Sequence, residues 1–161
     1  MVVSLFSEDS YLFESPAKVV TQGVDESGHY LILDRTIFYP QGGGQPSDVG
    51  VVKCGESVFK ITGVRKNGDL IKHYAAQLDV ENLDGTDCFC VLDKATRILH
   101  MRHHTAGHLV SNVAEFLYPE IIAMKAHCFP GEAYVEFQGT GVCESDEIGT
   151  AIMDAIKSDS P

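Results

Sequence analysis

The hydrophobic pattern changes its period once, near residue 93, and this change constrains the fold more than any other feature of the sequence. Before it, short runs rich in β-branched and aromatic residues alternate with turn sequences, as is typical of strands in a small barrel or curled sheet. After it, apolar residues recur every three or four positions, as in a helix. The pattern predicts an α+β fold. We expect a β-barrel-like lobe over residues 1–93 and, over residues 94–161, an α/β lobe in which a long helix packs on a sheet.

The strands expected in the first lobe are separated by glycine, asparagine and aspartate. The clearest turn is Asn67-Gly68, because Asn-Gly between two β-rich runs is a strong hairpin signal. Strands are expected over 17–24, 29–34, 36–39, 49–53, 58–64, 70–74 and 87–92.

The second lobe begins with a helix that Pro119 should end. One face of this helix is apolar and the opposite face is polar. A hairpin around Pro130-Gly131 and a second helix from Ser145 should follow. The apolar stripe consists of Leu99, Ala106, Leu109, Val110, Val113, Phe116 and Leu117, and the polar face of Arg97, His100, His104, His108, Ser111 and Glu115.

Composition excludes several classes of protein. Of the 161 residues 44% are hydrophobic and 22% charged, so a folded globular chain is expected, and no apolar run is long enough to cross a membrane. No secretory signal is readable and the five cysteines are an odd number, so a cytoplasmic protein with reduced thiols is expected. The net charge of −11 argues against a broad basic surface for nucleic acid. Over residues 94–125 the four basic residues Lys94, Arg97, Arg102 and Lys125 outnumber the two acidic ones, so any contact with a polyanion is expected to be local and centred there.

His104 and His108 are four residues apart on the expected helix, so their imidazoles project from one face. Two ligands of a single metal ion require this geometry. The zinc-protease signature also needs a glutamate beside the first histidine, and Thr105 stands there instead. The alternative is an exposed polar stripe in which the histidines are neighbours by chance.

A glycine-rich stretch runs from Asp34 to Gly50 with the sequence DRTIFYPQGGGQPSDVG. Three consecutive glycines, Gly42, Gly43 and Gly44, allow a ligand to approach the backbone closely, and exposed amides there could receive an anion or a carbonyl oxygen. Thr36 and Gln45 add neutral hydrogen-bonding groups. The stretch matches neither the dinucleotide-binding nor the P-loop pattern, and a tight bend in a barrel is the alternative.

The two motifs together resemble a known family. Asp34–Gly50 is similar to the glycine-rich motif of the editing region of alanyl-tRNA synthetases and of the free-standing AlaX trans-editing proteins. Arg102–Leu109, RHHTAGHL, is similar to the HxxxH motif of the same family. The editing domain of threonyl-tRNA synthetase shares only the histidine motif, which favours the alanyl branch.

The resemblance implies an aminoacyl-tRNA deacylase that removes serine or glycine wrongly attached to alanine tRNA. It implies that the aminoacylated 3′ end of the tRNA is bound and that the cofactor is zinc. Thr36 would sense the serine hydroxyl and Gln45 would shape the pocket. The implied catalytic residues are Thr36, Gln45, His104 and His108, the substrate-binding residues Gly42, Gly43, Gly44, Gln45 and Arg102, and the zinc ligands His104 and His108.

One feature of the family is missing from this sequence. The family completes its zinc site with a downstream CxxxH motif, and none follows residue 109 here. This indicates either a truncated chain or domain fragment, which we expect, or a natural protein with a reduced site. In both cases zinc should bind weakly or not at all. His127 and Cys128 are the first candidates for a further ligand, if the hairpin folds over the helix.

Two other functions stay open at this point. The chain could be a non-catalytic module that binds a tRNA end or a protein partner, or the N-terminal fragment of a larger synthetase-related protein. It could also be a metal-dependent hydrolase of a different ester. The editing hypothesis makes a spatial prediction, namely that the glycine-rich loop faces the HxxxH helix across a cleft.

Overall fold

The structure is a computed structural model that describes residues 2–80 and 82–158. The chain divides into two compact units. The first contains the residues up to Gly42 together with Pro46–Ile98, and the second contains Gly43–Gln45 together with the residues from Leu99 onward. The tip of the glycine-rich loop thus belongs to a different unit from the rest of that loop.

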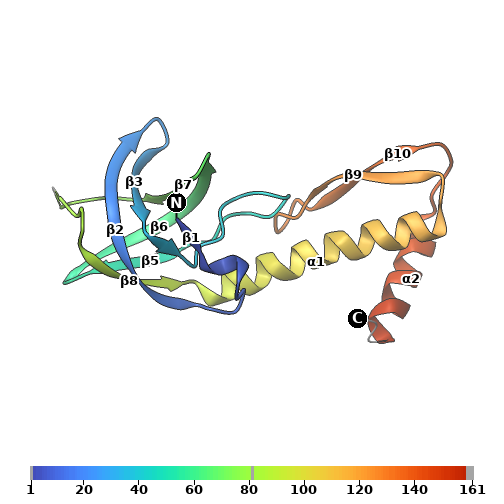
Figure 1. Ribbon diagram of the computed structural model, residues 1–161. Coiled ribbons are helices and arrows are strands. Elements are labelled where there is room, and N and C mark those ends of the chain that lie inside the picture. The colour runs from blue at the N-terminus through green and yellow to red at the C-terminus, as the bar shows by residue number, and fades with distance from the viewer. Residues whose placement is uncertain (1, 81, 159–161) are drawn as a thin grey trace. The chain divides into compact units, whose positions relative to one another are not determined.

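The first unit is built around a closed barrel of six strands in the order β2-β3-β7-β6-β5-β8 (Figure 1). All six pairs of neighbouring strands are antiparallel. This confirms the α+β class and the barrel-like N-terminal lobe. The strands are β2 (Glu14–Asp25), β3 (Gly28–Leu33), β5 (Gly50–Cys54), β6 (Ser57–Asn67), β7 (Leu70–Ala75) and β8 (Asp87–Leu92).

The barrel closes because alternate side chains of its strands point into a shared core. In β8 the residues alternate between exposed and buried along most of the strand, as the two-residue period of a strand requires. The core is apolar, and its largest members, including Leu31, Leu33 and Ile61, have no exposed surface. Burial of these side chains stabilises the barrel by roughly 1.5–3 kcal/mol each.

A short parallel pair, β1 (Val3–Ser4) with β4 (Arg35–Thr36), and the 3-10 turn η1 (Leu5–Ser7) complete this unit. The expected strand over 36–39 is therefore wrong beyond its first residue. Thr36 Oγ1 accepts a hydrogen bond from the Phe38 backbone N–H at 3.0 Å, which turns the chain away from an extended path.

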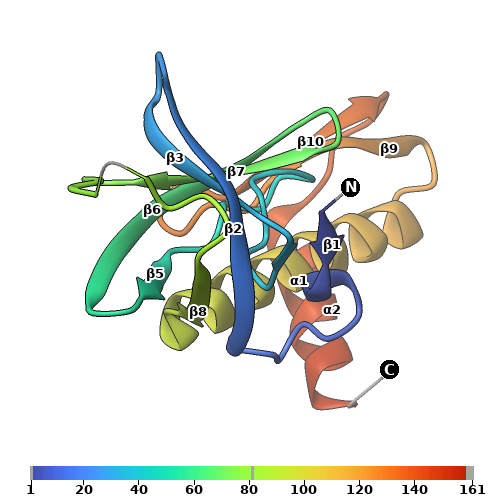
Figure 2. The same ribbon diagram turned by 60° about the vertical axis from the view of Figure 1, so that its left-hand side comes forward.

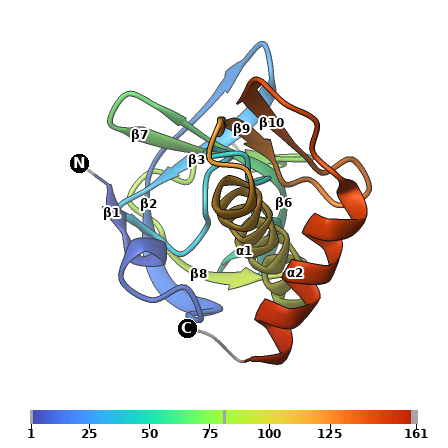
Figure 3. The same cartoon turned by 90° about the vertical axis from the view of Figure 1, so that its right-hand side faces the viewer.

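Helix α1 (Lys94–Leu117) runs from the first unit into the second, which also contains β9 (Ile121–His127), β10 (Tyr134–Gly139) and α2 (Ser145–Lys157). Strands β9 and β10 form an antiparallel hairpin that lies along α1 (Figures 2 and 3). The helix, the hairpin and the second helix were all predicted. None of the helices within residues 2–80 and 82–158 combines the length and apolar character needed to cross a bilayer.

The burial of α1 differs from the expected amphipathic pattern. Phe116 of the apolar stripe is 84% exposed, whereas His100 of the polar face is buried. The hairpin packs where the helix carries small residues: a Cβ added to Gly107 would lie 2.8 Å from Cys128 Sγ, and Ala114 has no exposed surface. Helix packing thus follows the small residues rather than the large apolar ones.

Candidate functional site

His104 and His108 point toward each other from consecutive turns of α1. Their Nε2 atoms lie 3.1 Å apart and their ring centroids 4.7 Å apart. Burial and the neighbouring His108 lower the pKa of His104, so that its imidazole is neutral at pH 7. His104 Nδ1 is buried without a hydrogen-bond partner in the described part of the chain. A neutral imidazole can act as a metal ligand or as a proton acceptor.

The pair fits two ligand positions of a zinc ion, but the set is incomplete. Within residues 2–80 and 82–158, no three histidine, cysteine, aspartate or glutamate side chains are arranged to hold a metal. Cys128 packs against α1 at Gly107, and burial raises the pKa of its thiol, which disfavours the thiolate that would bind zinc. The expectation of weak zinc binding therefore stays a prediction.

The tip of the glycine-rich loop is held by Cys128, the residue that directly follows β9. The Cys128 backbone N–H donates a hydrogen bond of 2.8 Å to the Gly44 carbonyl. Gly43 and Gly44 have φ angles of 57° and 79°, which favour glycine, and a Cβ on Gly44 would overlap the Ala126 carbonyl oxygen. Because Cys128 also packs against Gly107, β9 joins the loop tip to the helix that carries the histidine pair.

The base of the same loop is fixed within the barrel unit by a buried ion pair. Tyr39 N–H donates to Asp48 Oδ2 at 2.6 Å, and Asp48 N–H donates to the Tyr39 carbonyl at 3.0 Å. Asp48 in turn accepts three hydrogen bonds from Arg97, at 2.8 Å and 3.0 Å from Nε and at 2.5 Å from a terminal guanidinium nitrogen, and both side chains are almost completely buried. Arg97 also donates to the Ile37 and Ser10 carbonyls. The pair thus ties both ends of the loop to the start of α1.

Thr36 is buried and its hydroxyl is engaged with the fully buried His73. His73 Nδ1 lies 3.1 Å from the Leu31 carbonyl, which can only accept, so the ring proton is on Nδ1. Nε2 is then the acceptor for the Thr36 hydroxyl at 2.7 Å. Burial lowers the pKa of His73 to about 4 despite this carbonyl contact, which keeps the ring neutral. Thr36 donates its only proton to His73 and accepts from Phe38, leaving one lone pair for a ligand.

The remaining candidate residues divide between the two units. Gln45 is buried and Arg102 is exposed on α1, and both belong to the second unit with Gly43, Gly44 and the histidine pair. Thr36 and Gly42 belong to the barrel unit.

Sequence reasoning missed three side chains of these networks: His73, Asp48 and Arg97. Each acts through a partner far away in the sequence, since 37 residues separate His73 from Thr36 and 49 separate Arg97 from Asp48. The sequence offered two signals, a lone histidine at an inward position of a strand and an aspartate four residues after the last glycine of the run, and neither identifies its partner.

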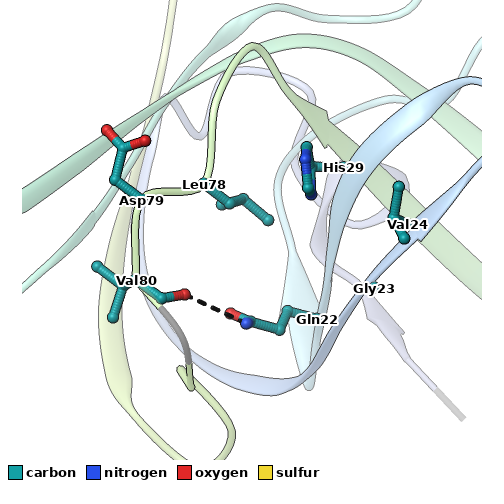
Figure 4. Close-up of a pocket in the computed structure, with 7 residues that line it drawn as sticks. All are labelled: Gln22, Gly23, Val24, His29, Leu78, Asp79 and Val80. Atoms are coloured by element: carbon teal, nitrogen blue, oxygen red, sulfur yellow. Dashed lines mark hydrogen bonds between the residues drawn. The ribbon is translucent and has the colours of Figure 1, made fainter.

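The barrel also has a cavity of about 360 Å³ between the β2–β3 hairpin and the loop after β7 (Figure 4). Gln22 crosses one end of it and donates a hydrogen bond of 3.3 Å to the Val80 carbonyl. None of the sequence-predicted site residues lines this cavity. Its lining residues are Gln22, Gly23, Val24, His29, Leu78, Asp79 and Val80.

Comparison with known proteins identifies the family. The model of the class II (A) tRNA synthetases matches residues 10–96, which is more than half of the chain. The chain belongs to this family. Its relatives place it in the alanyl-tRNA branch: it is 40% identical over 106 residues to the alanine–tRNA ligase of Ignicoccus hospitalis and 39% identical over 111 residues to that of Pyrococcus abyssi. Each match covers 66% of this chain and 11% of the ligase.

A free-standing editing protein is also similar to the chain. The alanyl-tRNA editing protein AlaX-L of Pyrococcus horikoshii is 34% identical over 119 residues, covering 73% of this chain and 29% of AlaX-L. The chain thus matches less than a third of the length of AlaX-L and about a ninth of each ligase. The resemblance to the alanyl-tRNA editing family is confirmed.

Proposed function

We propose that this chain is an aminoacyl-tRNA deacylase of the trans-editing type, which hydrolyses the ester between alanine tRNA and a wrongly attached serine or glycine. The observation that carries the proposal is the connection of the glycine-loop tip to the helix of the histidine pair. Cys128 makes that connection, through its hydrogen bond to Gly44 and its packing against Gly107. The tip of the glycine-rich motif, Gly43–Gln45, and the HxxxH motif thereby lie in one compact unit.

The need for such a site follows from the limits of binding. A synthetase pocket for a small amino acid discriminates weakly against one that differs by a methyl or hydroxyl group, so a second hydrolytic site is required. In the proposed reaction water attacks the ester carbonyl carbon, and the bond from that carbon to the ribose oxygen breaks. The water loses a proton and the ribose oxygen gains one, so a proton acceptor and an oxyanion acceptor site are both useful.

The residues of the second unit supply candidates for both roles. Without a bound metal, the neutral His104 imidazole can accept the proton of water, and the positive-φ backbone of Gly43 and Gly44 can direct N–H groups toward the carbonyl oxygen. The buried Gln45 adds a neutral amide. Zinc is the expected cofactor: His104 and His108 would hold it, and when bound it would polarise the ester and acidify water.

The test is a deacylation assay with alanine tRNA charged with serine, glycine or alanine. The proposal requires release of serine or glycine and sparing of the alanine ester. Loss of activity in His104→Ala, with the unchanged chain as reference and the Cys143→Ala variant of an exposed cysteine as matched control, assigns hydrolysis to the histidine pair. If none of the three esters were hydrolysed, the non-catalytic module would be favoured instead. The lack of a third metal ligand among the described residues supports that alternative.

A further inference from the structure

Three aromatic rings form a stacked cluster at the turn end of the β9–β10 hairpin. The rings of His127 and Phe129 are parallel within 3°, with centroids 4.1 Å apart. The Tyr134 ring lies 5.2 Å from His127 at 23°. Tyr134 is 44% exposed, so the cluster presents an aromatic ring to solvent. These rings belong neither to the barrel core nor to the proposed hydrolytic site.

A cavity of about 220 Å³ adjoins this cluster within the second unit. Its volume lies below the roughly 300–1,000 Å³ of pockets for drug-sized ligands and suits a single planar ring system. Its walls are mostly apolar, with imidazoles at two positions. Helix α1 contributes His103, Ala106, Gly107 and Val110, and the hairpin contributes His127, Cys128, Ala133, Tyr134 and Val135.

The cavity adjoins both parts of the proposed hydrolytic site. On α1, His103 and Gly107 line the cavity and directly precede His104 and His108, which lie about 100° further around the helix. On the hairpin, the lining residue Cys128 donates its backbone N–H to Gly44. A ligand seated in the cavity would therefore have one end beside the loop tip and the histidine pair.

The local charges favour stacking over phosphate attraction. Lys125 is the ammonium group that contacts the ring cluster: it lies 5.6 Å from the Tyr134 ring centroid and donates to its hydroxyl at 3.2 Å. Glu136 is 3.8 Å from the same ammonium and offsets its charge, and the whole chain carries −11. Base stacking on aromatic side chains needs no positive field and is a common mode of recognising unpaired RNA ends.

We propose that the ring cluster His127–Phe129–Tyr134 and the adjoining cavity bind the 3′-terminal adenine of the substrate RNA by stacking. This rests on the proposed function and deepens it, because it assigns recognition of the terminal base to the hairpin and leaves the ester to the loop tip and the histidine pair. Binding of the base should be independent of the attached amino acid. It should also depend weakly on salt, in contrast to binding through many phosphate contacts.

The test is an NMR titration of the full chain with the uncharged trinucleotide CCA, in which dissociation constants come from backbone amide shifts. Removal of the exposed ring in Tyr134→Leu should weaken binding roughly 5- to 150-fold, the range for loss of one base–aromatic stack. Tyr134→Phe keeps the ring and serves as the matched control, with affinity within about twofold of the original. Lys125→Gln should change affinity less than Tyr134→Leu does.

Several results would overturn the proposal: no binding of CCA, equal binding of CCA and CCU, or equal loss in Tyr134→Leu and Tyr134→Phe. A large loss in Lys125→Gln with none in Tyr134→Leu would likewise show that phosphate attraction is the cause. Melting curves of each variant exclude a folding defect as the reason for lost affinity. A chain that binds CCA through Tyr134 but releases no amino acid would refute the proposed hydrolysis and leave the base site standing, so the two failures are distinguishable.

Discussion

Replacement of the buried His73 by glutamine should remove a pH-dependent part of the stability of the barrel. The imidazole is completely buried, packs edge-on against Phe38 at 5.4 Å, and is held between Leu31 and Thr36. Its pKa is about 4 in the folded chain against a usual value of 6.5. Between these two values the unfolded chain binds a proton that the folded chain does not, so stability must fall as the pH is lowered through this window.

The magnitude follows from the two pKa values. A shift of this size is worth about 3 kcal/mol in total, of which about 2 kcal/mol is lost between pH 7.5 and pH 5.0. The comparison stops at pH 5.0 because most carboxylates titrate below it. In His73→Gln this loss should be absent. The variant should also be about 1–3 kcal/mol less stable at pH 7.5, because the glutamine amide cannot make both hydrogen bonds of the imidazole, to the Thr36 hydroxyl and the Leu31 carbonyl, with the same geometry.

The assay is urea unfolding followed through the amide signals of Val52 and Ile61, which lie in the barrel core and report on that unit alone. His29→Gln changes an exposed histidine of the same barrel and is the control, which should retain the pH dependence of the original chain. If His73→Gln and the unaltered chain lost the same free energy between pH 7.5 and 5.0, the neutral, buried imidazole inferred here would be wrong.

Four further outcomes are expected. Thr36→Val should slow hydrolysis of the serine ester roughly 5- to 150-fold more than that of the glycine ester, and equal losses would give this residue a structural role only. Arg97→Met should lower the free energy of unfolding by about 3–5 kcal/mol in urea titrations, since Asp48 is left buried without its partner, and a loss under 1 kcal/mol would contradict this. Gly44→Ala should reduce deacylation on the order of tenfold or more while the melting of the barrel is unchanged, because the strain falls on the loop tip. Elemental analysis after dialysis should find well under one zinc per chain. One tightly held zinc would show that a further side chain binds the metal beside His104 and His108.

The elements of the fold could be predicted from sequence because their signals are local. Strand β8 has the predicted bounds, Asp87–Leu92, since its alternation and flanking turns lie within a few residues. The hairpin at Asn67-Gly68 and the end of α1 before Pro119 depend on equally local chemistry. Strand β1 was missed because it is two residues long and exists only by pairing with β4.

Burial on α1 could not be predicted, because it depends on partners distant in the sequence. A helical wheel assigns Arg97 to the solvent face, but Asp48 and two backbone carbonyls satisfy its guanidinium in the interior. The role of His73 could not be predicted either, because its partner Thr36 is also distant in the sequence. The histidine pair was accessible to sequence reasoning because its spacing alone sets its geometry, whereas the link from Gly44 to that helix through Cys128 required the structure.

The central claim is that the tip of the glycine-rich loop and the histidine pair form one aminoacyl site. It is tested most directly by NMR titration with a non-hydrolysable analogue, adenosine carrying serine through a 3′-amide. The account predicts that the amide signals of Gly43–Gln45 and the imidazole signals of His104 and His108 shift together along one binding curve. Shifts confined to one of the two groups, or two curves with different midpoints, would contradict it.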